Sequence, residues 1–407
     1  MFYTRGLLDR ISAGSAQFPA LLLTGPRQVG KTTLLQHAAD TDRRYVTLDD
    51  PTVRALARED PSLFLRQNPP PLLIDEVQYA PGLFPYLKVE IDRLRRPGLF
   101  WLTGSQQFHM MREVTETLAG RVAVIQMLGF SWREGTRRRV DLEPFLPTRE
   151  CVADRMVDRA GADTEELYRF IWTGSMPVLS AGPVLDRSLF LSSYVQTYLQ
   201  RDVRDLSQVG SQESFLRFLK ACAARTGQML NLSDLARDVD ISVGTARSWL
   251  SILEASLQVY LLPPFHTNVT KRLIKRPKMY FLDTGLCSYL ADWTSPGTLA
   301  SGAMAGAILE TFVLAEILKS WWHRMRQPSL YFYRDKDGRE VDFLFAQDRV
   351  LYPVEVKRSA TPQRDWRRPL AALDRLSGQR GPGAVICLAA APIALDELIM
   401  AVPVDIL

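Results

Sequence analysis

The segment that most constrains the fold of this 407-residue chain is Gly25-Pro-Arg-Gln-Val-Gly-Lys-Thr32. A short apolar run, Pro19–Gly25, leads into it, and a segment with helical character, Lys31–Ala39, follows it. A loop of the pattern GxxxxGK[ST] between a strand and a helix exposes backbone N–H groups to phosphates, and the helix N-terminus adds the positive end of its dipole. The segment therefore predicts a phosphate-binding P-loop inside an α/β domain.

Short apolar segments that predict strands recur through the first third of the chain, and helical segments such as Phe84–Arg95 separate them. The predicted strands are Pro19–Gly25, Tyr45–Leu48, Pro71–Asp75, Leu99–Thr103 and Val122–Met127. Strands that alternate with helices form a parallel sheet covered on both faces. The expected fold class is therefore α/β, beginning with the parallel sheet of a P-loop nucleoside triphosphatase.

Side-chain chemistry assigns the roles in the predicted nucleotide site. Lys31 would reach the β- and γ-phosphates, and the Thr32 hydroxyl would bind magnesium. Asp75 ends an apolar strand and would hold magnesium, while Glu76 would act as the base that orients the attacking water. The other residues expected to surround the nucleotide are Gly25, Pro26, Arg27, Gln28, Val29, Gly30 and Thr33. ATP and Mg²⁺ are the expected cofactors.

The fourth predicted strand ends in Thr103-Gly-Ser105. A small polar side chain there would lie at the sheet edge where ligands of open parallel sheets bind. Ser105 is therefore a candidate for contacting the γ-phosphate as a sensor, and Gln106 is a second candidate. An ordinary turn from strand to helix is the alternative for this segment.

Beyond about residue 135 the alternating pattern gives way to helical segments, and a mixed pattern returns after residue 300. The predicted segments are helices at Glu165–Trp172, Leu185–Leu206, three within 212–262, one at Ala305–Met325 and one near 366–376, with strands between the last two and a surface loop at 377–383. The glycine and proline residues of that loop are typical of a connection at the surface.

Residues 232–254 have the pattern of two helices joined by a turn. Ser233 is expected to cap the first helix, and Ile241-Ser242 to form the turn. An apolar stripe on the second helix would bury it against the first. Two strands, Val259–Pro264 and Met279–Leu282, would add the wing of a winged helix.

Basic residues are concentrated between the two predicted wing strands. They are Lys271, Arg272, Lys275, Arg276 and Lys278. Such a cluster neutralises phosphates, and the second helix offers few side chains that read bases, so contacts with DNA would be mostly to its backbone. Lys271, Arg272, Lys275 and Arg276 are the expected contacts, and a structural or protein-docking role is the alternative.

Four polar residues interrupt the core-like pattern of the C-terminal region: Glu310, Asp342, Glu355 and Lys357. Glu310 lies on the predicted long helix, and Asp337-Gly338 is a hairpin signal before the strand that carries Asp342. Glu355 and Lys357 are two residues apart on one strand, so they share a face. An Asp, then Glu-x-Lys, with a helical Glu, resembles the PD-(D/E)XK fold of restriction endonucleases.

That resemblance implies roles for the four residues. Asp342 and Glu355 would be metal ligands, Lys357 would stabilise the attacking hydroxide or the developing charge, and Glu310 would be an auxiliary ligand. The residues before Asp342 are Glu340-Val341 rather than a proline, which is a small departure from the pattern. The alternative is a degenerate core kept for folding or dimerisation.

The motifs GPRQVGKTT, LIDEVQ, LTGS and Leu118-Ala-Gly-Arg121 occur in this order, followed by Tyr194–Asp202 and Lys278–Leu286. Together they resemble the AAA-type ATPases of bacteria and archaea that carry a C-terminal domain of unknown function. The resemblance covers nearly the whole chain. It implies that Arg121 completes a nucleotide site, either within the chain or across the interface of a homo-oligomer, with a structural surface arginine as the alternative.

The patterns and the resemblance predict a chain of several domains. They are an AAA-type P-loop ATPase domain at 1–140, a helical connector at 141–210, a winged-helix-like domain at 211–290 and a restriction-endonuclease-like domain at 300–407. The four cysteines are widely spaced and histidines number only four, which argues against a structural zinc site. Free thiols in a reducing cytoplasm are expected. A span of about 18 apolar residues is absent, so no membrane partner is expected.

Two functional hypotheses follow from the sequence. In the first, the chain is an ATPase that acts on nucleic acid and carries a magnesium-dependent nuclease module. In the second, it is a nucleotide-dependent switch or scaffold that binds DNA or a protein, and its nuclease-like domain is catalytically silent. The net charge of +5 permits a nucleic acid partner without requiring one.

Overall fold

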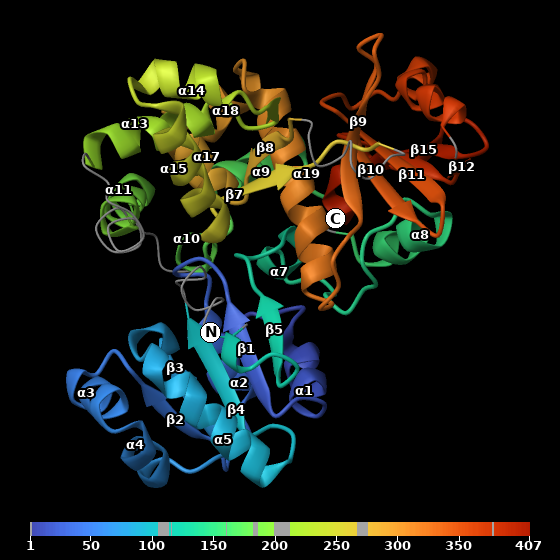
Figure 1. Ribbon diagram of the computed structural model, residues 1–407. Coiled ribbons are helices and arrows are strands. Elements are labelled where there is room, and N and C mark those ends of the chain that lie inside the picture. Colours follow the sequence, from blue (N-terminus) through green and yellow to red (C-terminus); the bar gives the residue numbers. More distant parts are fainter. Residues whose placement is uncertain are drawn as a thin grey trace. The chain divides into compact units, whose positions relative to one another are not determined.

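A computed structural model describes residues 2–104, 114, 116–159, 161–181, 186–198, 212–266, 276–376 and 378–407 of the chain (Figure 1). The chain divides into two compact units. The first consists of Met1–Gly129 with the short segments Ala255–Leu257 and Trp322–Met325, and the second consists of Phe130–Glu254, Gln258–Trp321 and Arg326–Leu407. The finer division of the second unit into three domains stays a prediction.

The first unit contains a five-stranded sheet in the order β2-β3-β4-β1-β5, and every paired neighbour runs parallel. Its strands are β1 (Ala20–Thr24), β2 (Arg44–Thr47), β3 (Leu72–Asp75), β4 (Phe100–Gly104) and β5 (Val122–Gln126). Each of the predicted strands is present, and each end differs from the prediction by at most one residue. The expected α/β fold with a parallel sheet is confirmed.

Helices cover both faces of this sheet. Alternate residues of its strands point to opposite faces, and on both faces these residues are apolar and need to be buried. The helices are α1 (Leu8–Ser15), α2 (Lys31–Ala38), α3 (Pro51–Glu59), α4 (Pro61–Gln67) and α5 (Phe84–Leu94), with 3₁₀ turns η1 (Val77–Tyr79) and η2 (Pro81–Leu83). Leu22 and Ile74 belong to one buried cluster, while Leu21 and Leu73 belong to another on the opposite face. Burial on both faces explains why these strands read as continuous apolar runs.

The second unit begins with short helices and a small antiparallel sheet in the order β6-β8-β7. These elements are α7 (Trp132–Gly135), α8 (Arg149–Val157), α9 (Thr164–Thr173), α10 (Pro177–Ser180), α11 (Arg187–Tyr198), α13 (Gln212–Ala223), β6 (Gln228–Met229), α14 (Leu232–Val239), α15 (Val243–Ala255), β7 (Val259–Leu262), β8 (Lys278–Phe281), α17 (Thr284–Leu290) and α18 (Pro296–Ser301). The two predicted helices of the helix-turn-helix are α14 and α15. The cap of α14 differs from the prediction, because Asn231, not Ser233, accepts the backbone N–H bonds.

The C-terminal part of the second unit is a mixed sheet beside the long helix α19 (Figure 1). Its elements are α19 (Ala305–Trp322), β9 (Leu330–Arg334), β10 (Glu340–Gln347), β11 (Val350–Lys357), η4 (Arg364–Arg367), η5 (Pro369–Arg375), β12 (Gln379–Arg380), β13 (Gly383–Cys387), β14 (Ile393–Ala394), β15 (Ile399–Pro403) and η6 (Val404–Ile406). The main path is β14-β15-β13-β11-β10-β9, and β12 pairs with β11. Antiparallel pairing of β9, β10 and β11 changes to parallel pairing from β11 through β13 to β15.

Two predictions for this part were wrong. The helix expected near 366–376 is a pair of 3₁₀ turns, and Pro369 stands where an α-helix would need an N–H donor. The surface loop expected at 377–383 instead contains β12, and Gly383 begins the buried strand β13. Side chains of Val350 and Tyr352 lie within 3 Å of where a Cβ on Gly381 would stand, so close packing explains a glycine that resembled a loop signal.

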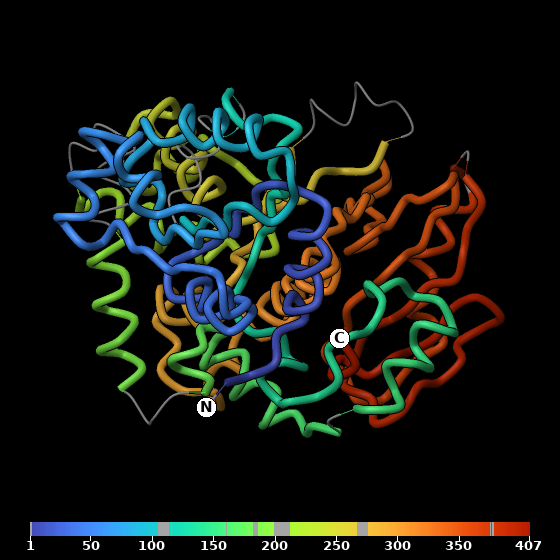
Figure 2. Tube along the Cα trace, turned by 90° about the horizontal axis from the view of Figure 1, so that it is seen from below, coloured from blue at the N-terminus to red at the C-terminus, as the bar shows by residue number. Residues whose placement is uncertain are grey.

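Segments far apart in the sequence lie side by side at the end of the second unit. Figure 2 shows the teal and green segment that contains α8 next to the red C-terminal segment. Arg159 Nε donates to Asp405 Oδ1 at 2.6 Å, and Arg149 donates to the backbone oxygen of Glu397 at 2.8 Å. These contacts attach the segment around α8 to the end of the mixed sheet.

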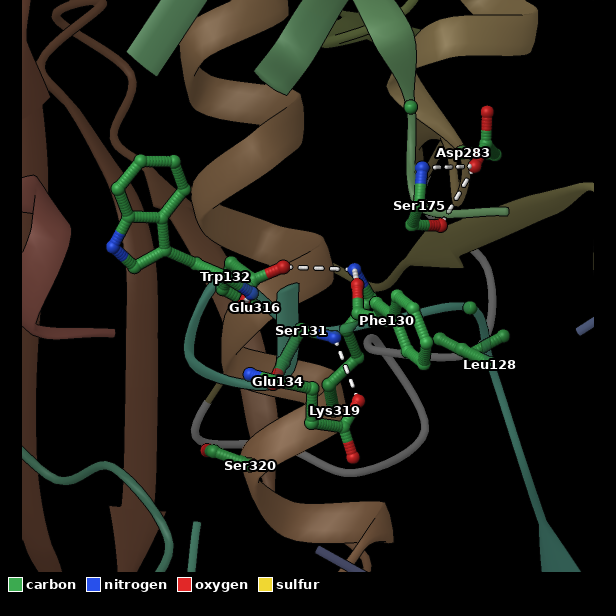
Figure 3. Close-up of polar contacts among 12 residues, drawn as sticks. Leu128, Phe130, Ser131, Trp132, Glu134, Ser175, Asp283, Glu316, Lys319 and Ser320 are labelled. Atoms are coloured by element: carbon green, nitrogen blue, oxygen red, sulfur yellow. Dashed lines mark hydrogen bonds and ion pairs between the residues drawn. The ribbon is translucent and has the colours of Figure 1, made fainter. Parts of the chain in front are cut away.

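A buried ion pair on α19 is hydrogen-bonded to the first residues of the second unit (Figure 3). Lys319 Nζ donates to Glu316 Oε1 at 2.8 Å and to the backbone oxygen of Phe130 at 2.7 Å. Glu316 Oε2 accepts from the backbone N–H of Trp132 at 2.8 Å. Burial raises the pKa of Glu316, and the Lys319 ammonium offsets part of that rise. Inside the fold, the two charged groups and their backbone partners therefore supply the hydrogen bonds that water would otherwise supply.

A second polar connection in Figure 3 explains one of the family-like motifs. Asp283 Oδ1 caps α17 through the N–H of Leu286 at 2.7 Å, and Oδ2 accepts from the backbone N–H and the hydroxyl of Ser175 at 2.8 and 2.6 Å. Gly285 has no room for a side chain, because its Cβ would lie 2.4 Å from the backbone oxygen of Thr173. Asp283 and Gly285 thus serve helix packing.

Replacing Lys319 by Met should lower the free energy of unfolding of the second unit by about 3–5 kcal/mol at neutral pH, because Glu316 then keeps a buried charge without its partner. The raised pKa of Glu316 means that the folded state binds its proton at a higher pH than the unfolded state. Part of the loss should therefore be recovered as the pH falls toward 5. Urea denaturation at pH 7.5 and 5.5 measures this. The double variant Lys319→Met/Glu316→Gln is the control, and it should lose the pH dependence.

Candidate functional site

The P-loop of the first unit connects β1 to α2, and two glycines determine its path. Gly30 has a φ of 91° and precedes the first residue of α2. A Cβ on Gly25 would lie 2.0 Å from the backbone oxygen of Met127, so only glycine fits there. The loop therefore closes over the N-terminus of α2 in the form that presents N–H groups to phosphate.

Lys31 is buried inside this loop. Its ammonium donates to the backbone oxygens of Gly25 at 3.0 Å and Pro26 at 2.8 Å. Arg5 supports the loop as well, because it donates to the backbone oxygens of Val29 at 3.0 Å and Leu128 at 2.8 Å. No pattern in the sequence indicated Arg5, which lies far before the motif. Arg27 and Gln28, two further loop residues predicted to surround the nucleotide, lie in the sequence between Pro26 and Val29, whose backbone oxygens accept these bonds.

Asp75 is the centre of a hydrogen-bond network at the carboxyl edge of the sheet. Its Oδ1 accepts from the Thr32 hydroxyl at 2.8 Å and from the Thr103 hydroxyl, and its Oδ2 accepts from the Tyr45 hydroxyl at 3.1 Å. Burial, with the nearby Asp75 charge, raises the pKa of Tyr45 to about 12. Thr103 and Tyr45 were not predicted as partners of Asp75. Their positions on the predicted strands on either side of β3 could have indicated that they lie beside it.

The Thr32 hydroxyl and the Asp75 carboxylate fit the requirements of Mg²⁺. Both supply oxygen, which this ion prefers, and the two groups are already within hydrogen-bond distance. Such an ion would neutralise phosphate charge. The site predicted for magnesium from the sequence is therefore geometrically consistent.

Glu76 follows directly after β3 and has an unusual backbone conformation. Its φ of 57° and ψ of 43° lie in the left-handed region, which costs a non-glycine residue about 1 kcal/mol or more. The N–H of Glu76 donates to the Thr103 hydroxyl at 3.4 Å, and its carboxylate accepts from Gln78. This backbone directs Glu76 away from the path of the strand, and strain of this kind is concentrated at functional sites.

Other predicted residues lie elsewhere. Arg121 precedes β5 at the edge of the sheet opposite the P-loop, where it pairs with Asp92 at 2.7 Å. A strand of five residues spans roughly 16 Å, so Arg121 does not reach the P-loop of its own chain. Thr33 is exposed on α2. Ser105 and Gln106 lie outside the described residues.

In the second unit the structure brings the four predicted polar residues into one region. Two residues of β10, Asp342 and Phe343, stand opposite a single residue of β9, so a β-bulge lies at Asp342. Asp342 Oδ2 accepts from the N–H of Val356 on β11 at 2.8 Å. Glu355 Oε1 accepts from Lys357 Nζ at 2.6 Å, and Glu355 Oε2 is buried without a hydrogen-bond partner in the described part of the chain.

The last residue of the basic run noted in the sequence, Lys278, also lies in this region. Lys278, on β8, is 4% exposed, and its Nζ lies 2.5 Å from Glu340 Oε1, 3.0 Å from Glu310 Oε1 and 3.9 Å from Asp342 Oδ1. Tyr280, two residues further along β8, donates to Glu310 Oε1 at 2.5 Å. We call Lys278, Glu310, Glu340, Asp342 and Glu355 the carboxylate cluster.

The pKa values of Asp342, Glu355 and Lys278 in the carboxylate cluster are all raised, for different reasons. Burial raises the pKa of Asp342, and Glu310 and Glu355 raise it further. Burial also raises the pKa of Glu355, against the effect of Lys357. For Lys278, burial favours the neutral amine, but the surrounding carboxylates outweigh it and raise the pKa above its usual value. The ammonium of Lys278 is therefore a stable part of the cluster.

The carboxylate cluster does not fit a divalent metal as it stands. Among the described residues, no group of three or more His, Cys, Asp or Glu side chains is arranged to hold a metal ion. Lys278 occupies the space among three of the carboxylates, so a metal ion there would have to displace its ammonium group. The metal-ligand roles predicted for Asp342 and Glu355 stay a prediction, which the position of Lys278 disfavours.

The helix-turn-helix presents a polar face. Ser242, Arg247 and Ser248 are exposed, while Ala246 and Leu250 are buried. Of the basic residues predicted to contact DNA, Arg276 is exposed. Lys271, Arg272 and Lys275 lie outside the described residues.

Family models match three consecutive parts of the chain. Residues 17–136 match a model described as AAA domain, residues 164–297 match a domain of unknown function (DUF8612), and residues 305–407 match another domain of unknown function (DUF4143). With the P-loop geometry, the first match supports a P-loop ATPase-like domain in the N-terminal part of the chain.

Similar proteins cover nearly the whole chain. An uncharacterised protein of Mycobacterium tuberculosis, Rv2008c, is 29% identical over 403 residues, which are 98% of this chain and 83% of the relative, and Mb2031c of Mycobacterium bovis gives the same values. Among solved structures, the Walker-type ATPase PABY2304 of Pyrococcus abyssi is 15% identical with a TM-score of 0.43, covering 71% of this chain and 96% of that chain. The RuvB Holliday junction branch migration motor of Thermotoga maritima is 15% identical with a TM-score of 0.30, covering 64% and 91%. In the part of the chain that the structure describes, no helix is long and apolar enough to cross a membrane.

Replacing Gly25 by Ala should weaken ATP binding by at least about tenfold, or about 1.4 kcal/mol, because the new Cβ would force the P-loop away from Met127. Gly82→Ala is the matched control, since a Cβ at Gly82 meets nothing within 4 Å. Fluorescence titration with a labelled ATP analogue measures both variants. Equal affinities for the two would contradict the role given to Gly25.

Proposed function

We propose that the protein binds ATP with Mg²⁺, hydrolyses the ATP, and acts as a nucleotide-dependent switch on nucleic acid. The observation that carries the ATPase proposal is the network around Asp75, in which the Thr32 hydroxyl and residues from three neighbouring strands meet beside the P-loop. This is the arrangement that holds a metal-bound triphosphate in P-loop enzymes.

The contacts of Lys31 support its role in binding phosphate. Its ammonium is hydrogen-bonded to neutral carbonyl oxygens of the loop, and the negatively charged oxygens of a triphosphate are stronger acceptors. Lys31 would therefore exchange loop carbonyls for the β- and γ-phosphates.

Glu76 is the proposed base for the attacking water. Its carboxylate accepts from Gln78, whereas that of Asp75 accepts from Thr32 and Tyr45, so the two carboxylates would take separate tasks. Asp75 would hold magnesium, while Glu76, oriented by Gln78, would accept the proton of the water.

Lys31→Ala should remove ATP binding and hydrolysis together, because the phosphate charge loses its main cation. Glu76→Gln should keep ATP affinity within about twofold of the parent and lower the turnover rate by roughly 10²–10⁴, since the carboxylate acts in the chemical step. Phosphate release and nucleotide titration separate the two effects. Parent-like turnover of Glu76→Gln would show that another residue is the base.

Nucleic acid is the proposed partner, and the polar face of α15 together with the basic run in the sequence at 271–276 supports it. Arg247 and Arg276 are exposed, and α14 and α15 have the form of a helix-turn-helix. Basic side chains with few base-reading partners favour contacts to the phosphate backbone. Docking of a protein on the same face is the competing function.

Replacing Lys271, Arg272, Lys275 and Arg276 together by Gln should weaken binding to all DNA sequences alike. It should also flatten the dependence of affinity on salt, because fewer counterions are released. Fluorescence anisotropy at several salt concentrations measures this.

The matched control removes the same charge from exposed arginines of the first unit: Arg58, Arg66, Arg93 and Arg96. It should leave the affinity and its salt dependence close to the parent values. Loss of affinity for only one DNA sequence, or equal loss in both quadruple variants, would argue for a different partner or a different surface.

For the C-terminal domain, the pairing of Lys278 and Lys357 with carboxylates favours a nuclease-like domain without cleavage activity over a magnesium-dependent nuclease. Arg121 remains a candidate for completing a nucleotide site only across the interface of a homo-oligomer. The four cysteines carry free thiols, which fits a reducing cytoplasm.

A further inference from the structure

We propose that Lys278 is a built-in cation that takes the metal position of the carboxylate cluster and excludes divalent metal from it. The inference goes beyond ATP hydrolysis and does not depend on it. It concerns the second unit alone, where β8, α19, β10 and β11 meet.

The first argument is geometric. The ammonium of Lys278 contacts Glu310 from the helix and Glu340 and Asp342 from one strand, which are three separate carboxylates around one cation. A hard divalent cation needs carboxylate oxygens that converge in this way. The two cations therefore compete for one space, and covalent attachment of Lys278 to β8 gives it a high local concentration.

The second argument comes from how firmly Lys278 is held. Its side chain is 4% exposed, and its strand pairs with both β6 and β7. The neighbouring Tyr280 donates to the same oxygen of Glu310 that Lys278 contacts. A lysine on an exposed loop would be displaced easily, whereas this side chain starts from a paired strand and is almost fully buried.

The third argument is the state of Glu355. Its side chain is 6% exposed, one oxygen is paired with Lys357, and the other has no hydrogen-bond partner among the described residues. A buried oxygen of this kind normally coordinates a cation or carries a proton. This oxygen of Glu355 is a ligand position that a metal would fill if Lys278 were absent.

The experiment titrates Mn²⁺ into the full-length protein without nucleotide and follows free Mn²⁺ by electron paramagnetic resonance. The parent and Asp342→Asn should bind the same amount of Mn²⁺, because the cluster takes none in either. Lys278→Met should bind roughly one additional Mn²⁺ per chain, and Lys278→Met/Asp342→Asn should lose it again.

Lys220→Met is the matched control. Lys220 pairs with the exposed Asp292 at 3.5 Å, so its replacement removes the same charge from the same unit without touching the cluster. It should bind Mn²⁺ as the parent does. Thermal melting with and without Mn²⁺ gives a second measurement, in which only Lys278→Met should gain stability from the metal.

Two outcomes would overturn the proposal. One is a parent protein that binds more Mn²⁺ than Asp342→Asn, because the metal would then coexist with Lys278. This comparison stands even if Lys278→Met does not fold. The other is a folded Lys278→Met that binds no additional Mn²⁺. Neither outcome depends on whether the chain hydrolyses ATP, since nucleotide is omitted throughout.

Discussion

A buried ammonium group must find oxygen partners, and three lysines of this chain meet that requirement in three different ways. Lys31 is bonded to neutral loop carbonyls, Lys319 to one carboxylate and one carbonyl, and Lys278 to several carboxylates. The partner determines what each lysine does. Neutral carbonyls are weaker acceptors than phosphate oxygens, so they would allow Lys31 to exchange them for the proposed nucleotide. A single carboxylate makes Lys319 part of a structural ion pair, and a surplus of carboxylates holds Lys278 in place.

The same comparison separates the two candidate sites. At the sheet edge, Asp75 is held by hydroxyl groups of Thr32, Thr103 and Tyr45, which are neutral and leave its charge for a metal ion. In the carboxylate cluster, Lys278 and Lys357 already neutralise part of the carboxylate charge. The Asp75 carboxylate is therefore more open to an exchangeable cation than the carboxylate cluster is.

The sequence predicted the first unit well because its signals are local. The P-loop, its flanking strand and the acidic end of β3 are each contained in a few consecutive residues. Errors arose where tertiary context decided the outcome: Pro369 prevented a helix, and close packing around Gly381 resembled a loop signal. The role of Lys278 was not predictable, since in the sequence it belongs to a run of basic residues and its partners are distant, Glu310 by 32 positions.

Lys278 also has an evolutionary consequence. A substitution that removes its charge leaves several buried carboxylates without a counter-ion, and losing Glu310 or Glu340 leaves a buried ammonium with fewer partners. Neither change is tolerated easily by itself, so these positions should vary together in a lineage. A relative with an apolar residue in place of Lys278 and all the carboxylates retained would need a metal ion from solution in place of the lysine ammonium. Such a relative is the one in which to look for cleavage of nucleic acid.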